Sequence, residues 1–258
     1  MAPTGSTSME KPRTLIFPDL ESLNRATAVA FAQAVKQAIQ ERNRFLVAIS
    51  GGETPMELFS MLGGSPYRDY LPWQDIQVFW VDERCVAATD ADSNYGNAWQ
   101  HWLKQVTIPP ANLHRIPVEL AAADAVEAYE KDLRLFADPR STWVAFDLVL
   151  LGLGVDGHTA SLFPGSPVDT DGHALVSVVQ PSQGRLARRI SMTPLVINLA
   201  KQVIFMVSGA SKQTALAASR NPSSDLLRWP ARRIQPISGS LLWMVDQAAM
   251  GGTNSGNG

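Results

Sequence analysis

The sequence predicts an α/β fold in a single domain, with a mostly parallel, twisted sheet and helices on both of its faces. Short apolar runs alternate with amphipathic segments, and no repeat or Pro/Gly-rich linker divides the middle of the chain. The apolar runs are rich in Val, Ile, Leu and Phe without strict alternation, which is typical of parallel strands covered on both faces. Their alternation with helices indicates βαβ units. The predicted strands are residues 45–49, 76–81, 113–118, 146–151, 174–179, 203–207 and 241–245.

Three of the segments between these runs have helical patterns. Residues 23–40 and 122–136 each carry apolar side chains along one stripe. Residues 56–62 form a shorter helix that two glycines stop, and we expect Thr54 to cap it with Pro55 as its first residue.

Length and composition fit one domain with a large core. The chain has 258 residues, 45% of them hydrophobic and 18% charged, and a formal net charge of −2. α/β folds often reach this length as one unit. We expect the domain to span residues 13–250, between disordered polar tails at 1–12 and 251–258.

Several partners and compartments are disfavoured. Mixed charges provide no basic stripe for nucleic acid. Cys85 is the only cysteine, so an intramolecular disulfide and four-thiolate zinc sites are excluded, which fits a reducing cytoplasm. No signal-peptide core and no run of about 18 apolar residues is present. We therefore expect a cytoplasmic protein, monomeric or weakly dimeric, that binds neither nucleic acid nor membranes and requires no cofactor or metal.

Four predicted strands end in loops that carry glycines, carboxylates, cations or a histidine. In open α/β sheets, ligands bind beyond the carboxyl ends of the strands. The sequence therefore predicts one site assembled from four loops. These loops are Ser50-Gly51-Gly52-Glu53-Thr54-Pro55, Asp82-Glu83-Arg84, Gly152-Leu153-Gly154-Val155-Asp156-Gly157-His158 and Ser208-Gly209-Ala210-Ser211-Lys212.

The first and last of these loops can bind a phosphate. Small residues just before a helix let the backbone approach an anion closely. The free N–H groups at the start of the helix favour the negative charge of this anion. The segment lacks the lysine of a P-loop, so a plain strand-to-helix turn is the alternative. Lys212 can contact the same anion or be solvated. Of the pair Arg188 and Arg189, at least one is expected to be surface charge.

His158 is the candidate general base. It follows Asp156 in a glycine-rich loop, and an imidazole with a pKa of about 6.5 accepts a proton from water at neutral pH. Of Asp82 and Glu83, one is expected to pair with Arg84 and the other to face the ligand. Metal binding through Asp156, His158 and His173 is conceivable, but no known ligand spacing supports it.

Two further interpretations of these residues are weaker. Residues 152–157 match the dinucleotide fingerprint G-x-G-x-x-G, but Asp156 would bring a carboxylate to the pyrophosphate and the next strand ends in Gln180 rather than an acid. Cys85 beside Arg84 could be a nucleophile, although filling space at a strand end is the simpler interpretation.

Five blocks in this order resemble the 6-phosphogluconolactonases, whose fold is shared with glucosamine-6-phosphate deaminase and ribose-5-phosphate isomerase. The resemblance covers about residues 15–249 and implies hydrolysis of 6-phospho-D-glucono-1,5-lactone to 6-phosphogluconate in the oxidative pentose phosphate pathway. The blocks are SGGETP (50–55), VDERCV with SNYGNAW (81–99), LLGLGVDGHTASLFPG (150–165), RISMTPLVINLAKQVIFMVSGASKQTAL (189–216) and PISGSLLWMVDQAA (236–249).

The resemblance also implies roles for individual residues. His158 would remove the water proton, a neighbouring carboxylate, Asp82 or Asp156, would orient it, and Arg84 or loop N–H groups would face the oxyanion. The reacting end would comprise Asp82, Arg84, Asp156 and His158. The phosphate cradle would comprise Ser50, Gly51, Gly52, Thr54, Arg189 and Lys212.

Three rival functions can be compared with this one. The related deaminases typically show HIAFNEPG, and Phe163 occupies the position of their glutamate, which argues for a lactone substrate. A serine hydrolase would use Ser50, Asp82 and His158 in the order of an α/β-hydrolase triad, but G-x-S-x-G is absent around Ser50. A non-catalytic sugar-phosphate sensor should lose the acid–base residues, which this chain retains.

Overall fold

The computed structural model describes residues 12–137, 143–166, 174–181 and 187–252. Its centre is a seven-stranded sheet in which all neighbouring strands run parallel, as predicted. Its strands, in spatial order, are β1 (Arg13–Phe17), β10 (Ser240–Asp246), β9 (Gln202–Val207), β6 (Leu148–Gly152), β2 (Phe45–Ile49), β3 (Ile76–Trp80) and β5 (Leu113–His114).

The direction of travel across this sheet reverses between β2 and β6. From β2 the chain proceeds outward to β3 and β5, whereas from β6 it proceeds the opposite way to β9 and β10. Loops that leave two adjacent strands toward opposite faces open a crevice at their carboxyl ends. The loops after β2 and β6 are those that hold the glycines and His158.

A second sheet has three antiparallel strands, and it corrects two predictions. It comprises β4 (Asp82–Arg84), β8 (Arg189–Met192) and β7 (Val176–Val179). Residues 174–179 were expected in the parallel sheet, and residues 82–84 in a loop. Pairing to β8, more than a hundred positions beyond β4, determines both. Met192 N donates to Val81 O at 2.7 Å and joins the two sheets.

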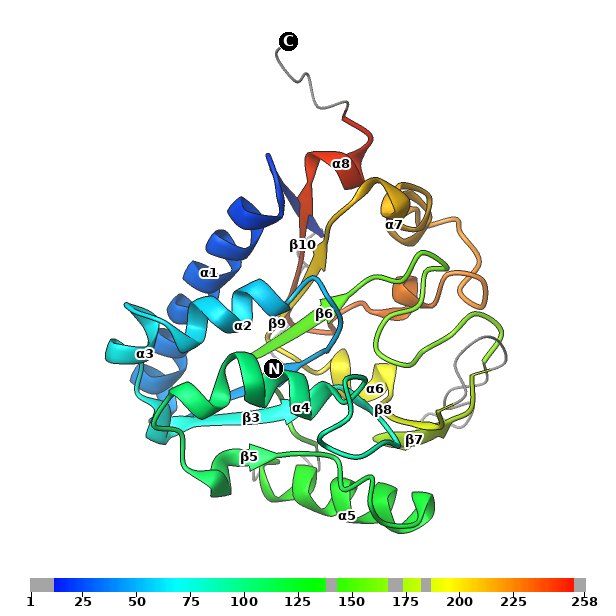
Figure 1. Ribbon diagram of the computed structural model, residues 1–258. Helices are drawn as coiled ribbons and strands as arrows, with labels where there is room; N and C mark the ends of the chain where they lie inside the picture. The colour runs from blue at the N-terminus through cyan, green and yellow to red at the C-terminus, as the bar shows by residue number, and fades with distance from the viewer. Residues whose placement is uncertain (1–11, 138–142, 167–173, 182–186, 253–258) are drawn as a thin grey trace, which may run out of the picture.

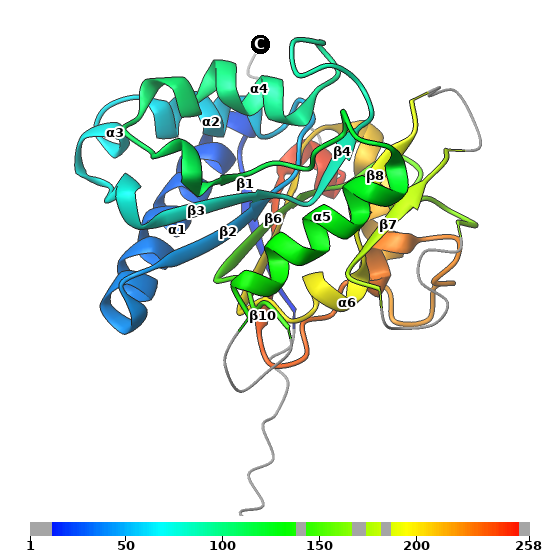
Figure 2. The same cartoon turned by 90° about the horizontal axis from the view of Figure 1, so that it is seen from below.

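Helices cover both faces of the main sheet, as predicted. Figure 2 shows α2 and α4 on one side of β2 and β3, and α5 on the other. No helix in the described part of the chain is both long and apolar enough to cross a membrane. The helices are α1 (Leu20–Arg42), α2 (Met56–Gly63), α3 (Tyr67–Tyr70), α4 (Asn94–His101), α5 (Ala122–Leu135), α6 (Pro194–Ile197), α7 (Gln213–Arg220) and α8 (Gln247–Met250), with 3₁₀ turns η1 (Trp73–Asp75), η2 (Leu103–Gln105), η3 (Pro110–Asn112), η4 (Ala210–Lys212) and η5 (Pro230–Arg233).

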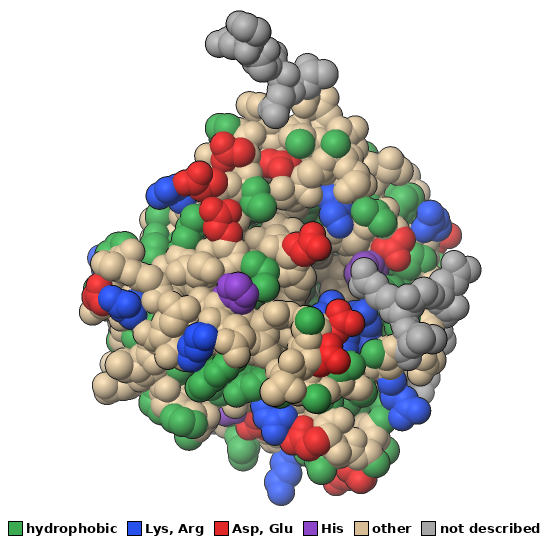
Figure 3. Space-filling view, in the orientation of Figure 1, with side chains coloured by type: hydrophobic (Ala, Val, Ile, Leu, Met, Phe, Trp, Pro, Cys, Tyr) green, Lys and Arg blue, Asp and Glu red, His purple; other side chains and the backbone are tan. Residues whose placement is uncertain are grey.

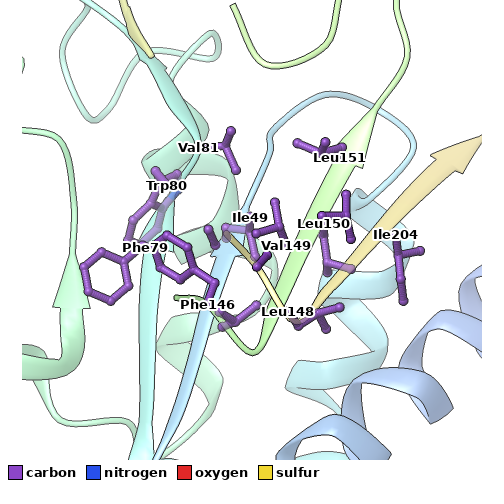
Figure 4. Packing of buried hydrophobic residues seen from close by; sticks show 14 of the residues in the cluster. Ile49, Phe79, Trp80, Val81, Phe146, Leu148, Val149, Leu150, Leu151 and Ile204 are labelled. Carbon is purple, nitrogen blue, oxygen red and sulfur yellow. The ribbon is translucent and has the colours of Figure 1, made fainter. Parts of the chain in front are cut away.

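The main core lies where the central strands meet the helices. All five residues of β2 are buried, and Figure 4 shows Ile49 beside Val149 and Leu150 of β6. Trp80 and Trp243 are among the largest fully buried side chains, and both belong to this core. These rigid strands fix the positions from which the loops depart.

Some predicted boundaries were wrong. The strand expected over 113–118 covers Leu113–His114 only, and β1 was missed. Thr54 does not cap α2: Pro55 stands at the cap position with φ −82° and ψ −3°, and no side chain caps the helix. The predicted tails lie almost wholly outside the described residues, although Gly251, with φ +86°, ends α8.

Candidate active site

The loops after β2, β3, β6 and β9 lie at one edge of the sheet, because these strands are parallel and adjacent. Ser50 N donates to Leu150 O at 3.0 Å, and Val81 N donates to Ile49 O at 2.9 Å, so hydrogen bonds join three of the four loop bases. In Figure 1 these loops extend from the strands toward the region between α7 and β8. Figure 3 shows this face hollowed right of centre, with basic, acidic and His side chains around the hollow.

His158 and Asp156 form a hydrogen-bonded pair. His158 Nδ1 lies 2.5 Å from Asp156 Oδ1, which also accepts from His158 N at 3.1 Å. Burial would raise the pKa of Asp156, but the hydrogen bond and charge of His158 outweigh it and lower this pKa to about 2. The carboxylate is therefore ionised at neutral pH and can only accept, so the proton of the pair resides on Nδ1.

The loop backbone is shaped around this pair. Gly154 N donates to His158 O at 2.7 Å and closes the loop. A Cβ at Gly154 would lie 2.0 Å from His158 Nδ1, so only glycine leaves room for the imidazole. Gly157 has φ +83°, and a Cβ there would lie 2.5 Å from the ring of Trp229.

The ring of Phe163 packs against both His158 and Arg189. Its ring centroid is 4.8 Å from that of His158, at an interplanar angle of 39°. Arg189 Cζ is 5.4 Å from the centroid of the same ring. Phe163 therefore contacts the candidate base and a candidate phosphate ligand at once.

Asp82 is buried in a polar network at the start of β4. Its Oδ2 accepts from Ser161 Oγ at 2.6 Å and lies 3.8 Å from Arg189 Nη1. Asn94 Nδ2 donates to Asp82 O at 2.7 Å. Asp82 is thus tied to the small sheet and to the loop after His158, whereas the carboxylate bonded to His158 is Asp156.

Glu83 has a structural role. Its carboxylate accepts from the backbone N–H groups of Arg84 and Asn94 at 2.8 Å and of Tyr95 at 2.7 Å, and so satisfies the start of α4. Burial raises the pKa of Glu83, while these hydrogen bonds lower it in part. Glu83 therefore points toward the start of α4, whereas Asp82 points toward Arg189.

Arg84 and Arg189 are opposite each other in the β4–β8 ladder. Arg84 NH1 donates to Asp92 O at 2.6 Å, and its Nε is buried without an acceptor among the described residues. Like charges directly across two strands repel. An anion near this pair would relieve the repulsion.

The glycine loop after β2 is backed by Asn94. A Cβ at Gly51 would lie 1.8 Å from Asn94 Oδ1, and Gly52 has φ +106°. Ser50 Oγ and Asn94 Oδ1 are buried and have no hydrogen-bond partner in the described ranges. Buried polar atoms of this kind are costly unless a ligand or water satisfies them. Thr54 is partly buried on the same loop.

The fourth loop is held by Asp246. This buried carboxylate accepts from Ser208 Oγ at 2.5 Å and from Gly209 N at 3.0 Å. Gly209 has φ +96° and precedes η4, which carries the partly buried Lys212. Sequence reasoning missed the structural contribution of Asp246, together with those of Asn94 and Ser161, although all three lie in the blocks that carry the resemblance.

The alternative interpretations find little structural support. No helix opens after Gly157: a turn and an isolated bridge between Thr159 and Leu162 follow, unlike a dinucleotide-binding loop. Burial raises the pKa of Cys85, which disfavours a thiolate, and Arg188 rather than Arg84 opposes this shift. Within the described ranges no three His, Cys, Asp or Glu side chains gather as metal ligands. His173 lies outside these ranges.

The chain belongs to the family of glucosamine-6-phosphate isomerases and 6-phosphogluconolactonases, whose model matches residues 18–243. It is 42% identical over 242 residues to a 6-phosphogluconolactonase of Synechocystis sp., covering 92% of this chain and 97% of the relative. The resemblance inferred from the sequence blocks is therefore confirmed.

Solved structures agree with this assignment. The 6-phosphogluconolactonase of Trypanosoma brucei is 27% identical, with a TM-score of 0.83 over 93% of this chain and 97% of that one. A monomeric glucosamine-6-phosphate deaminase shares the fold, at 18% identity and a TM-score of 0.79 over 93% and 99% of the two chains.

Proposed function

We propose that this protein hydrolyses 6-phospho-D-glucono-1,5-lactone to 6-phospho-D-gluconate, a step of the oxidative pentose phosphate pathway. Relatives named for this activity, one of them 42% identical, support the substrate. The observation that carries the proposal is the environment of His158: a carboxylate binds one ring nitrogen, and the apolar ring of Phe163 packs against the imidazole. This is the arrangement of a single base with one orienting carboxylate.

In the proposed mechanism, His158 acts as the general base through Nε2. Asp156 keeps the proton on Nδ1, so the lone pair of Nε2 can accept the proton of a water molecule as its oxygen attacks the lactone carbonyl. The resulting tetrahedral oxyanion collapses with cleavage of the bond to the ring oxygen. The imidazolium then returns its proton to that oxygen. Water is the only co-reactant of this reaction.

The remaining residues divide between the two ends of the substrate. Arg84 and loop N–H groups face the oxyanion. Hydrogen-bond donors that are held in place stabilise such a charge most strongly. The phosphate is held by Ser50, Gly51, Gly52, Thr54, Arg189 and Lys212, and Asp82 holds Arg189 in place. Buried Ser50 Oγ, which lacks a partner among the described residues, supports a ligand here. Binding energy from the phosphate orients the reacting carbon.

The test is a coupled assay with freshly prepared 6-phosphogluconolactone, glucosamine 6-phosphate and a p-nitrophenyl ester as parallel substrates. We expect turnover of the lactone alone. Ammonia release from glucosamine 6-phosphate would indicate the deaminase instead, and ester turnover alone a serine hydrolase. Tight sugar-phosphate binding without any turnover would indicate a sensor.

Variants at the two ends test the division of roles. His158→Ala should lower kcat by about 100-fold or more with little change in KM, because it removes the base. Lys212→Ala should mainly raise KM, because it removes a ground-state contact with the phosphate. A fully active His158→Ala would contradict the assignment of the base.

A further inference from the structure

We propose that Phe163 is a positioning residue that sets the spacing between the base His158 and the phosphate ligand Arg189. The inference rests on the proposed function and extends it. A 6-phosphorylated lactone presents its phosphate and its carbonyl at a separation that its own covalent frame limits. An enzyme that uses phosphate binding to place the carbonyl must therefore hold its phosphate ligand and its base at a matching separation.

Phe163 contacts both groups with one ring. The ring lies 4.8 Å from the imidazole centroid and 5.4 Å from Arg189 Cζ. It is partly buried and packs against the core. A rigid ring with two rotatable bonds transmits a position better than a flexible aliphatic chain.

The other contacts of His158 restrict it from different directions. Asp156 binds Nδ1, and Gly154 leaves so little room that a Cβ would lie 2.0 Å from this atom. Both residues belong to the loop after β6, whereas the backbone of Arg189 lies in β8 of the small sheet. Phe163 therefore links the loop that carries the base to the phosphate ligand itself, whereas the hydrogen bond from Ser161 N to Ser191 Oγ joins the same loop to β8 at another residue.

This role predicts a dependence on the substrate phosphate. Phe163→Leu removes the aromatic face but keeps an apolar side chain. We expect kcat/KM for 6-phosphogluconolactone to fall by between about threefold and thirtyfold, the range that one or two such aromatic contacts cover. For unphosphorylated glucono-1,5-lactone, which cannot use Arg189, the fall should be under about threefold. Phe163→Tyr, which keeps the ring, should restore most of the loss.

The experiment measures kcat/KM for both lactones in the wild type, Phe163→Leu and Phe163→Tyr. Phe136→Leu, which removes a partly buried ring that contacts His114 and Arg44 in the same way outside the candidate site, is the matched control and should leave both values unchanged. Phe163→Met replaces Phe163→Leu if the latter does not fold, and the same pattern is expected.

Equal losses on the two lactones would overturn the inference, because Phe163 would then act on the base alone. Unchanged values in Phe163→Leu, or no recovery in Phe163→Tyr, would overturn it as well. A wild type without lactonase activity would instead refute the proposed function. The two failures are therefore distinguishable.

Discussion

Asp156→Asn tests the proposed orientation of the base most directly. The carboxylate accepts the Nδ1 proton of His158 at 2.5 Å. An asparagine of the same shape can turn its NH₂ group toward Nδ1 and donate to it, which moves the imidazole proton to Nε2. Nε2 could then no longer accept a proton from water. We expect kcat to fall by about 100- to 10,000-fold, the contribution of a positioned general base.

Asp156→Asn should change the free energy of unfolding only slightly in comparison with its effect on kcat. Interaction with His158 lowers the pKa of Asp156 from 3.8 to about 2, which corresponds to about 2.4 kcal/mol without screening. Because 43% of the Asp156 side chain is exposed, solvent reduces this contribution to about 1 kcal/mol. Because the pKa of Asp156 is lower in the folded state than in the unfolded state, the ionised carboxylate stabilises the folded protein above about pH 4. This stabilisation is lost as the pH falls from about 4 to about 2.

Steady-state kinetics at pH 7 and urea unfolding together provide the measurement. Asp156→Ala should lose less kcat than Asp156→Asn, because it removes the carboxylate without imposing the wrong tautomer. Asp124→Asn, an exposed carboxylate at the start of α5, is the matched control and should retain wild-type kinetics. An Asp156→Asn variant within about threefold of the wild-type kcat would refute the reasoning, as would equal losses in the Asn and Ala variants.

Two further predictions concern the support of the site. Gly157→Ala should lower both kcat and the free energy of unfolding, the latter by about 2 to 4 kcal/mol, because it adds a clash with Trp229 to backbone strain. Gly165→Ala, at φ +69° in open space, should cost only about 1 kcal/mol in urea unfolding; equal costs would contradict the clash. Glu83→Gln should lower the melting temperature and the unfolding free energy by about 1 to 3 kcal/mol, since an amide offers one acceptor oxygen to three N–H donors. Unchanged stability would contradict this role.

The sequence predicts the inner strands of the main sheet well, because they are continuous apolar runs. It also predicts which loops meet, because parallel strands place their carboxyl ends at one edge. The small sheet could not be predicted in the same way. Residues 82–84 are all charged and form a strand only through pairing with β8, and β7 shows an apolar run that does not reveal the direction of its partner. Contacts such as that of Asn94 with Gly51 depend on this pairing and remain hidden for the same reason.

Strand alternation in β4 explains why two adjacent carboxylates differ in role. Successive side chains of a strand point to opposite faces, so Asp82 and Arg84 share one face and Glu83 occupies the other. The first face lies toward Arg189 and Ser161, and the second lies toward the N–H groups that open α4. Burial raises the pKa of Glu83, and backbone N–H groups together with the Ser93 hydroxyl compensate this carboxylate. The negative charge of Asp82 is compensated by Arg189, a cation that the proposed reaction uses. A one-residue shift of β4 against β8 would exchange the two faces, and Arg189, the proposed phosphate ligand, would lose its contact with Asp82. The register of a three-residue strand therefore contributes to the site as much as the identity of its residues.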